Sequence, residues 1–408
     1  MNPAPDTAFP VDVVTPSGVG GFAAKFTAEQ PLPALAARLG AWLAGLWGGP
    51  FRLGHTIILA RHADVAEMLA RDLDFRIAPV NGPRIDAVNG PFVLGLDRGA
   101  TLIRERAALY RALSQVDLSA IRVSVAHQAA ERIEAAGDDG IDVVGGYARP
   151  IAARTARALF GTGGPDERSF MDVARAIFAH VFLNLSGDKV VEARALRAAG
   201  PLRRWLADEI AARRAAGDLG TDMMGALLRD GLLDDDGVRR TLGGMLVGSI
   251  DTTATAVAKI IAVIGRDPAL LARVAADAED PECLAGWCRE ALRRWPHNPI
   301  LMRRAAAPTR LGTVEIRAGD QVVAWTQAAM LDPDVFPDPQ TMRPDRPAAA
   351  YLHFGGGVHP CAGRAINAFQ IPLLVGALIR RGIAGIGPVE WAGPFPDRLT
   401  VRFGRDMA

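Results

Sequence analysis

The segment that most constrains this chain is the run Phe354–Gly363, which reads Phe-Gly-Gly-Gly-Val-His-Pro-Cys-Ala-Gly. It places one cysteine, Cys361, in a glycine-rich turn, with Phe354 seven positions before it and a helical pattern after it. Glycines let backbone N–H groups close around a sulfur without clashes from side chains. Such N–H groups hydrogen-bond a metal-bound thiolate, and an aromatic ring can shield it. The segment therefore predicts a thiolate ligand for iron; the alternative is a buried structural cysteine beside a flexible loop.

A second motif lies about seventy residues earlier, where Glu290 and Arg293 are three positions apart. On a helix these two side chains are neighbours, so the pair alone is equally typical of a surface ion pair. The sequence Arg294-Trp295-Pro296 should end this helix, because proline cannot continue it. Arg346 follows shortly before the cysteine segment.

A third motif is the run Gly243–Ala254, which contains Asp251 and Thr252. An acid next to an alcohol can deliver protons inside an otherwise apolar pocket. The alternative is a cluster that caps the start of a helix, where Asp and Thr are favoured. Apolar residues continue on both sides as far as Ile264, which favours the interior of a long helix.

These three motifs together resemble the cytochrome P450 superfamily, of the soluble bacterial type. The first resembles its haem-binding signature, the second its Glu-x-x-Arg motif and the third its oxygen-activation stretch, and the resemblance covers roughly residues 50–405. It implies a mainly α fold with a minor β-sheet region, in which haem lies between the long central helix and the helix that follows the cysteine. It also implies that Glu290, Arg293 and Arg346 form a buried triad.

The resemblance implies haem b (iron protoporphyrin IX) as a non-covalent cofactor, with Cys361 as the metal ligand. Basic side chains are expected at its propionates, because arginine suits carboxylates. The expected cofactor-binding residues are Cys361, His359, Arg303, Arg106, Phe354, Gly355 and Gly363.

The chain departs from the family pattern in two places. Ser249 stands where a glycine is usual, so its side chain should crowd the distal pocket or add a hydroxyl to it. The helix around residues 101–109 lacks an expected histidine, and either Arg104 or Arg106 could contact the haem. Because Arg104 and Arg106 are two residues apart on a helix, they cannot both face the haem. The sequence that follows favours Arg106. As in the family, the long helix is expected to bulge near Thr252.

The implied activity is that of a haem-thiolate monooxygenase, with Asp251 and Thr252 as catalytic residues. It would insert one oxygen atom of O2 into a C–H bond of a small, largely apolar molecule. The chain has no flavin, nicotinamide or iron–sulfur fingerprint. Electrons from NAD(P)H are therefore expected through a separate partner, either a ferredoxin with its reductase or a flavodoxin-type donor. Docking is expected near Cys361, where Arg364 contributes positive charge.

Three other functions remain open. One is a peroxygenase that uses hydrogen peroxide, against which the Asp251–Thr252 pair argues. The second is a non-oxygenating isomerase or dehydratase, for which Ser249 is at most a hint. The third is a haem-thiolate sensor without enzymatic activity.

Composition restricts the partners and the compartment. The formal net charge is +1, so bulk charge predicts neither nucleic acid nor membrane binding. Only three cysteines occur, and with no signal-peptide pattern at the start we expect a cytoplasmic protein. Cys283 and Cys288 are predicted to be core residues. Residues 1–21 are predicted to be an irregular N-terminal arm and residues 22–408 a single domain.

Hydrophobic periodicity predicts helices and strands along the chain. Helices are predicted over residues 35–47, 62–70, 101–113, 120–136, 151–160, 168–185, 191–215, 238–264 and 269–278, around Glu290 and after Cys361. Strands are predicted over residues 56–59, 311–316, 321–324 and 399–401, with Gly319-Asp320 as a hairpin turn. The substrate pocket is predicted to be lined by Pro91, Phe92, Val93, Leu94, Phe178, Phe182, Met245, Val247, Ile300 and Leu301.

Overall fold

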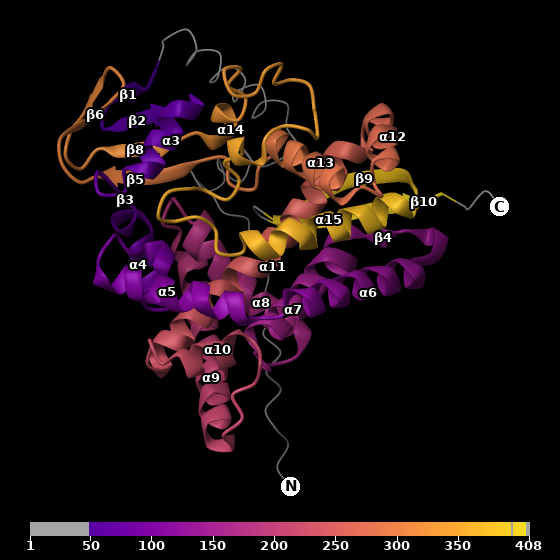
Figure 1. The fold of residues 1–408 in the computed structure, drawn as a ribbon, viewed down its shortest axis with the longest axis horizontal. Helices are drawn as coiled ribbons and strands as arrows, with labels where there is room; N and C mark the ends of the chain where they lie inside the picture. Colours follow the sequence, from indigo (N-terminus) through magenta and orange to yellow (C-terminus); the bar gives the residue numbers. More distant parts are fainter. Residues whose placement is uncertain (1–48, 393–394, 405–408) are drawn as a thin grey trace.

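The computed structural model describes residues 49–392 and 395–404. The predicted arm over residues 1–21 and the predicted helix over residues 35–47 lie outside this part of the chain. Figure 1 shows a helical body on one side and, on the other, a sheet packed against α3 and α14, with α11 passing through the middle. The described structure is thus mainly helical with small sheets, which confirms the predicted fold class.

Helices make up most of the described residues. The helices are α3 (His62–Ala70), α4 (Ala78–Val88), α5 (Ala100–Gln115), α6 (Leu118–Ala136), α7 (Arg149–Phe160), α8 (Glu167–Phe178), α9 (Lys189–Ala216), α10 (Met223–Asp230), α11 (Asp235–Gly265), α12 (Pro268–Ala276), α13 (Pro281–Arg294), α14 (Thr326–Ala329) and α15 (Arg364–Arg380). Shorter turns of helix are η1 (Val93–Gly95), η2 (Gly137–Asp139), η3 (Val143–Ala148), η4 (Ala179–Leu183) and η5 (Ala348–Ala350).

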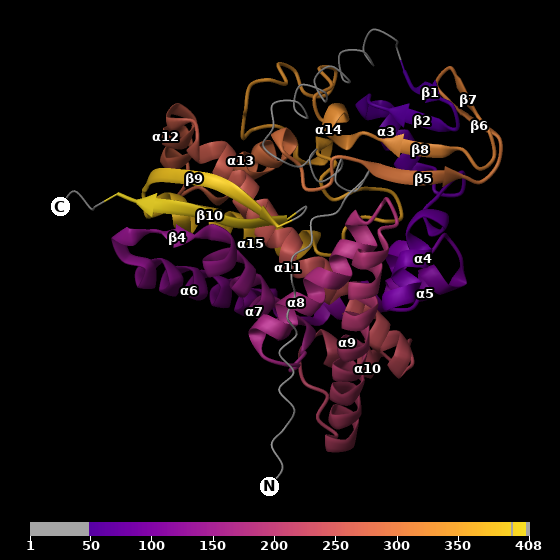
Figure 2. The ribbon, with the colours of Figure 1, turned by 180° about the vertical axis from the view of Figure 1, so that it is seen from behind.

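The strands form three small sheets. They are β1 (Phe51–Leu53), β2 (Thr56–Leu59), β3 (Phe75–Arg76), β4 (Ile141–Asp142), β5 (Leu301–Ala305), β6 (Thr309–Leu311), β7 (Val314–Ile316), β8 (Gln321–Ala324), β9 (Ile383–Ala392) and β10 (Phe395–Phe403). The largest sheet has the order β1-β2-β8-β5-β3, in which only β2 and β8 run parallel. A second sheet has the order β4-β10-β9, and β6 pairs with β7. Figure 2 shows that β9 and β10 lie at the opposite end of the molecule from the largest sheet.

Helix α11 is the centre of the core. Asp234 caps its start by accepting a hydrogen bond from the N–H of Gly237 at 2.8 Å. Of the described helices, only α11 is long and apolar enough to cross a membrane, and 78% of its apolar window is buried inside the fold. Its apolar character on all sides is therefore that of a helix surrounded by protein.

The structure corrects several sequence predictions. Helix α4 was not predicted, because Pro79 opens it and Pro83 lies inside it, and both break the usual periodicity. The turn at Gly319-Asp320 is not a hairpin, because β7 pairs with β6 and β8 pairs with β2 and β5. Asp320 instead accepts a hydrogen bond from the N–H of Arg317 at 2.7 Å. The expected bulge near Thr252 is wrong, since α11 is α-helical from Asp235 to Gly265.

The strand predicted over residues 311–316 is also wrong, because Gly312 at φ +51° turns the chain between β6 and β7, which pair as a hairpin. Several other predicted elements are confirmed. α3 and β2 have the predicted bounds, and α13 ends at Arg294, before Pro296. The predicted helix over residues 168–185 is α8, continued by the wider turn η4. Hydrophobic periodicity alone does not reveal where a helix widens.

The predicted triad is present and buried. Glu290 accepts hydrogen bonds from Nε and Nη2 of Arg293 at 2.7 and 2.8 Å, and both side chains are fully buried. Nε of Arg346 lies 3.4 Å from the same carboxylate, and the Tyr351 hydroxyl donates to it at 2.8 Å. Burial by itself would raise the pKa of Glu290, but the hydrogen bonds and charge of Arg293 hold that pKa below its usual value.

The two arginines also hold the chain that leads to the cysteine segment. Arg293 donates to the carbonyl oxygens of Met330 at 3.2 Å and Pro339 at 2.8 Å. Arg346 donates to those of Asp338 at 3.0 Å and Thr341 at 3.1 Å. The triad therefore ties α13 to the long irregular connection between α14 and α15.

We predict that Glu290→Gln lowers the free energy of unfolding by about 3–5 kcal/mol, because two arginines lose their buried counter-charge. Glu315→Gln is the control, since Glu315 is exposed and forms a 3.4 Å surface pair with Arg310; its effect should stay below about 1 kcal/mol. Urea unfolding followed by circular dichroism measures both. Because the pKa of Glu290 is lowered in the fold, its stabilising effect is present above the unfolded pKa and lost as the pH falls. Equal effects of the two substitutions would contradict the prediction.

Lys259 is a buried amine on α11. Its Nζ donates to the carbonyl oxygen of Pro296 at 2.8 Å and lies 5.2 Å from the centre of the Trp295 ring. Burial lowers the pKa of Lys259 to about 7. Between pH 7 and the higher pKa that Lys259 has in the unfolded chain, the unfolded state binds up to one more proton than the folded state. The free energy of unfolding therefore rises with pH in this range.

We predict that the free energy of unfolding of wild type, relative to that of Lys259→Met, rises by about 1 kcal/mol per pH unit between pH 7 and 9. Urea unfolding at several pH values measures this difference. Lys189→Met provides a control, because Lys189 is exposed and paired with Glu192, and its difference from wild type should not change with pH. Parallel pH profiles of wild type and Lys259→Met would refute the assignment.

Candidate active site

The cysteine segment forms a tight loop that ends at the start of α15. The N–H of Cys361 donates to the carbonyl oxygen of Phe354 at 2.8 Å, which closes the loop. Gly357 has φ +63°, and a Cβ there would lie 1.8 Å from the carbonyl oxygen of Leu69. Only glycine fits this close approach to the end of α3.

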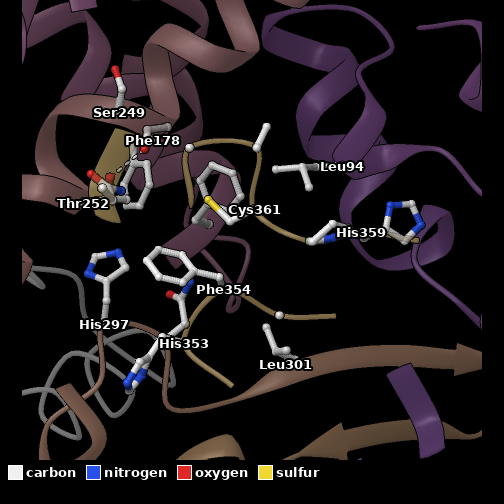
Figure 3. Close-up of a pocket in the computed structure, with 18 of the residues that line it drawn as sticks. Leu94, Phe178, Ser249, Thr252, His297, Leu301, His353, Phe354, His359 and Cys361 are labelled. Carbon is white, nitrogen blue, oxygen red and sulfur yellow. Dashed lines mark hydrogen bonds between the residues drawn. The ribbon is translucent and has the colours of Figure 1, made fainter. Parts of the chain in front are cut away.

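The sulfur of Cys361 faces an internal cavity of about 830 Å³ (Figure 3). Burial raises the pKa of the Cys361 thiol, while a hydrogen bond from the backbone of Gly363 lowers it. Cys361 is exposed only in the sense that its thiol borders this cavity. A thiol that faces a cavity and whose anion receives a backbone hydrogen bond suits a metal ligand, since a bound cation would replace the proton. The described residues contain no cluster of three or more His, Cys, Asp or Glu side chains that could hold a metal ion. A single-thiolate ligand is therefore the metal chemistry that this cavity offers.

A group of basic side chains borders the same cavity. Arg303 is 7% exposed, and its Nη1 donates at 2.8 Å to the carbonyl oxygen of Met302. Burial lowers its pKa to about 10. Burial also lowers the pKa of His359 to about 4, and the positive charges of Arg303 and Arg106 contribute to this shift. The charges of Asp72 and Asp97 act on the pKa of His359 in the opposite direction. Arg106, Arg303 and His359 all line the cavity.

The structure brings Arg106 to the cavity, whereas Arg104 is not among the lining residues. The guanidinium carbon of Arg106 lies 5.1 Å from the centre of the Tyr110 ring. Arg111, one turn further along α5, pairs with Asp230 at 3.2 Å. Of the arginines on α5, Arg106 alone borders the cavity.

The residues present fit haem. Its two propionates need cationic partners, and Arg106 and Arg303 border the cavity, with neither forming a close ion pair among the described residues. Phe354, Gly355 and Gly363 also line the cavity, around Cys361. A thiolate ligand and two uncompensated arginines in one apolar chamber are what a dianionic metalloporphyrin requires.

Helix α11 forms another wall of the cavity through Gly248, Ser249 and Thr252. The Thr252 hydroxyl donates to the carbonyl oxygen of Gly248 at 2.6 Å, and the Ser249 hydroxyl donates to that of Leu246 at 2.8 Å. Figure 3 shows the Ser249 hydroxyl directed away from Cys361. The serine therefore adds bulk to the wall rather than a free hydroxyl in the cavity.

Asp251 is on the other side of α11 and does not line the cavity. It is 2% exposed, and its Oδ1 lies 3.1 Å from Nε of Arg149 and 2.8 Å from Nη2 of Arg175. Its Oδ2 is buried and has no hydrogen-bond partner. Arg175 also pairs with Asp397 at 2.9 Å, and that aspartate is half exposed. The network leads from the long helix to the surface.

Most of the predicted apolar pocket residues line the cavity, but Pro91 and Val247 do not. Cys288 is buried as predicted, whereas Cys283 is only partly buried, since it lies in the first turn of α13. Sequence reasoning missed Arg84 and His297, which also line the cavity. Arg84 is on the unpredicted helix α4, and His297 follows α13 in an irregular stretch, so neither belongs to a periodic pattern that could have revealed it.

The chain is similar in sequence to known proteins. The family model for cytochrome P450 matches residues 211–381. Nocardicin C N-oxygenase from Nocardia uniformis subsp. tsuyamanensis is 30% identical over 62% of this chain and 61% of its own length. Luteothin monooxygenase from Streptomyces thioluteus is 27% identical over 85% of this chain and 88% of its own length. The first three curated relatives are matched over only 47–61% of their lengths.

The fold also has close structural counterparts. The crystal structure of CalO2 superposes with a TM-score of 0.78 and 22% identity, covering 93% of this chain and 99% of that one. The similarity to CalO2 concerns the fold alone, whereas the sequence matches extend across α11, α13 and the Cys361 loop. In its fold, in the Cys361 loop and in the relatives that it matches, the chain is similar to the cytochrome P450 superfamily.

Proposed function

We propose that this protein is a haem-thiolate monooxygenase that inserts one oxygen atom of O2 into a C–H bond of a small, largely apolar molecule. The observation that carries the proposal is the position of Cys361 in the wall of a cavity that Thr252 on α11 also borders. Apolar side chains dominate the remaining walls, which suits an apolar ligand. Relatives whose names are those of monooxygenases and hydroxylases support the reaction type.

In this proposal Cys361 is the ligand of haem b, and Arg106, Arg303 and His359 bind its propionates. Phe354, Gly355 and Gly363 shape the loop around the sulfur. When bound to a thiolate, haem supplies the activation of dioxygen. The protein must then exclude bulk water, orient the substrate and deliver protons.

Proton delivery is assigned to Asp251 and Thr252. Oδ2 of Asp251 is the oxygen that neither arginine contacts, so it is the site where a proton can be held. Because Asp251 does not line the cavity, the proton must pass to Thr252 by a movement of the carboxylate or through water. The Thr252 hydroxyl donates to Gly248, so its oxygen lone pairs are left to accept a hydrogen bond from that water.

Electrons are proposed to come from NAD(P)H through a ferredoxin and its reductase or a flavodoxin-type donor. Arg364 is exposed at the first position of α15, three residues after Cys361. Positive charge at this end of α15 would attract an acidic partner toward the shortest route to the sulfur. We also propose that the protein acts in the cytoplasm, where its thiols stay reduced.

We predict that Cys361→Ala abolishes the thiolate-type absorption of the reduced protein with carbon monoxide, because Cys361 is the one cysteine of the described residues that lines the cavity. Cys283→Ala is the matched control and should keep the wild-type spectrum, because Cys283 is at the start of α13, outside the cavity. Optical spectra of the purified haem-loaded proteins measure both. An unchanged spectrum in Cys361→Ala would overturn the proposed function.

We predict that Asp251→Asn lowers turnover about 100-fold with little change in the dissociation constant of the substrate, because an amide cannot pass on a proton. A substrate is first selected by optical titration of a compound library, and turnover is measured with NADH, ferredoxin and reductase. Asp397→Asn is the control, since Asp397 contacts Arg175 from the surface side, and its turnover should stay within a few-fold of wild type.

The same assay separates the alternatives. A peroxygenase would turn over with hydrogen peroxide and be indifferent to Asp251→Asn. An isomerase or dehydratase would need no reductant, and a sensor would show no turnover with any of these reactants.

A further inference from the structure

The cavity carries more positive charge than a haem would compensate. Arg84, Arg106 and Arg303 all line it, and no Asp or Glu among the described residues does. Two propionates account for two of these arginines. One cation in a largely apolar chamber therefore remains without a counter-charge.

Arg84 is the arginine that stands apart from the other two. The charges of Arg303 and Arg106 both act on the pKa of His359, and Arg84 is not among the groups that shift it. Arg84 instead acts on His180 of η4, whose pKa is lowered by burial, raised by the charge of Glu192 and lowered further by the charge of Arg84. Glu192 itself pairs with Lys189 at 2.7 Å. Helix α4, which carries Arg84, also packs against η4.

No carboxylate in the described part of the chain lies within ion-pair distance of Arg84. Among the described residues it forms no ion pair, its Nε is buried without a hydrogen-bond partner, and burial alone lowers its pKa. Its one side-chain hydrogen bond among the described residues runs from Nη2 to Oδ1 of Asn81 at 3.4 Å. A partly buried guanidinium with so few partners is costly unless an anion joins it.

Asn81 lies one turn before Arg84 on α4 and also lines the cavity. Its Nδ2 donates to the carbonyl oxygen of Leu94 at 3.2 Å, which leaves its Oδ1 directed to the guanidinium. The amide therefore helps to hold the guanidinium in place, and the planar fork of arginine suits the paired oxygens of a carboxylate or phosphate.

We propose that Arg84, positioned by Asn81, binds an anionic head group, a carboxylate or a phosphate monoester, of an otherwise apolar substrate. This inference rests on the proposed function and names the class of molecule that the cavity accepts. Anchoring of one end at α4 would leave the apolar remainder of the molecule in the chamber between α11 and Cys361.

The test uses the full-length haem-loaded protein and three probes that share a twelve-carbon chain. They are dodecanoate, dodecyl phosphate and the uncharged methyl dodecanoate. Calorimetric titration at micromolar concentration gives the dissociation constants for wild type, Arg84→Gln, Arg84→Lys and the control Arg197→Gln. Arg197 is exposed on α9 and outside the cavity, so its substitution changes the net charge equally without touching the site.

We expect Arg84→Gln to weaken at least one of the two anionic probes about tenfold or more, with the methyl ester unchanged. Arg84→Lys should retain part of the affinity, because a lysine keeps the charge but loses the fork. Whichever anionic probe responds more identifies the head group.

Two results would overturn the inference. One is equal affinity of wild type and Arg84→Gln for both anionic probes, and the other is an equal loss in Arg197→Gln, which would indicate non-specific attraction. Failure of the proposed function is recognised separately, since it appears as the absence of the thiolate spectrum in wild type before any probe is added.

Discussion

The buried ion pair between Glu290 and Arg293 is the interaction on which the rest of the site depends. Both side chains are fully buried, so neither charge has access to water. Their spare hydrogen-bonding capacity is used by Tyr351, Arg346 and backbone carbonyls of the connection between α14 and α15. This connection has little regular structure of its own, and it carries the chain to the Cys361 loop. The position of the sulfur is therefore set by a charge cluster on α13 that is remote from it in sequence.

The long helix α11 lies between the apolar cavity and a network of charged side chains. On one side, Thr252 and Ser249 border the cavity, and their hydroxyls are both engaged by backbone carbonyls of the previous turn. On the other side, Asp251 is held by Arg149 and Arg175 in a network that reaches the surface at Asp397. Adjacent residues of a helix point in directions about 100° apart. Thr252 can therefore border the cavity while its neighbour Asp251 contacts the two arginines.

In the functions proposed here, different cationic side chains of the cavity anchor the cofactor and recognise the ligand. Arg106, Arg303 and His359 share one region, while Arg84 acts near His180. No Asp or Glu of the described residues lines the chamber, so the charges of Arg84, Arg106 and Arg303 would be best compensated by a bound anion. Charges without a counter-charge lower the stability of the fold, and such departures are expected at ligand-binding sites.

The sequence by itself determined the elements whose signal is local: the glycine-rich cysteine loop, the i, i+3 pair on α13, the bounds of α3 and the central helix. Glycine runs, helical spacing and apolar periodicity each involve residues that are close in sequence. They therefore indicate local structure before the tertiary fold is known. Only the tertiary structure decided that Arg106 rather than Arg104 borders the cavity, that Asp251 faces two arginines, and that Arg84 joins the chamber from an irregular, proline-containing helix. The direction of a side chain, its burial and the presence of a counter-charge are all set by contacts between segments that are far apart in the chain. They therefore depend on which surfaces of the fold pack together.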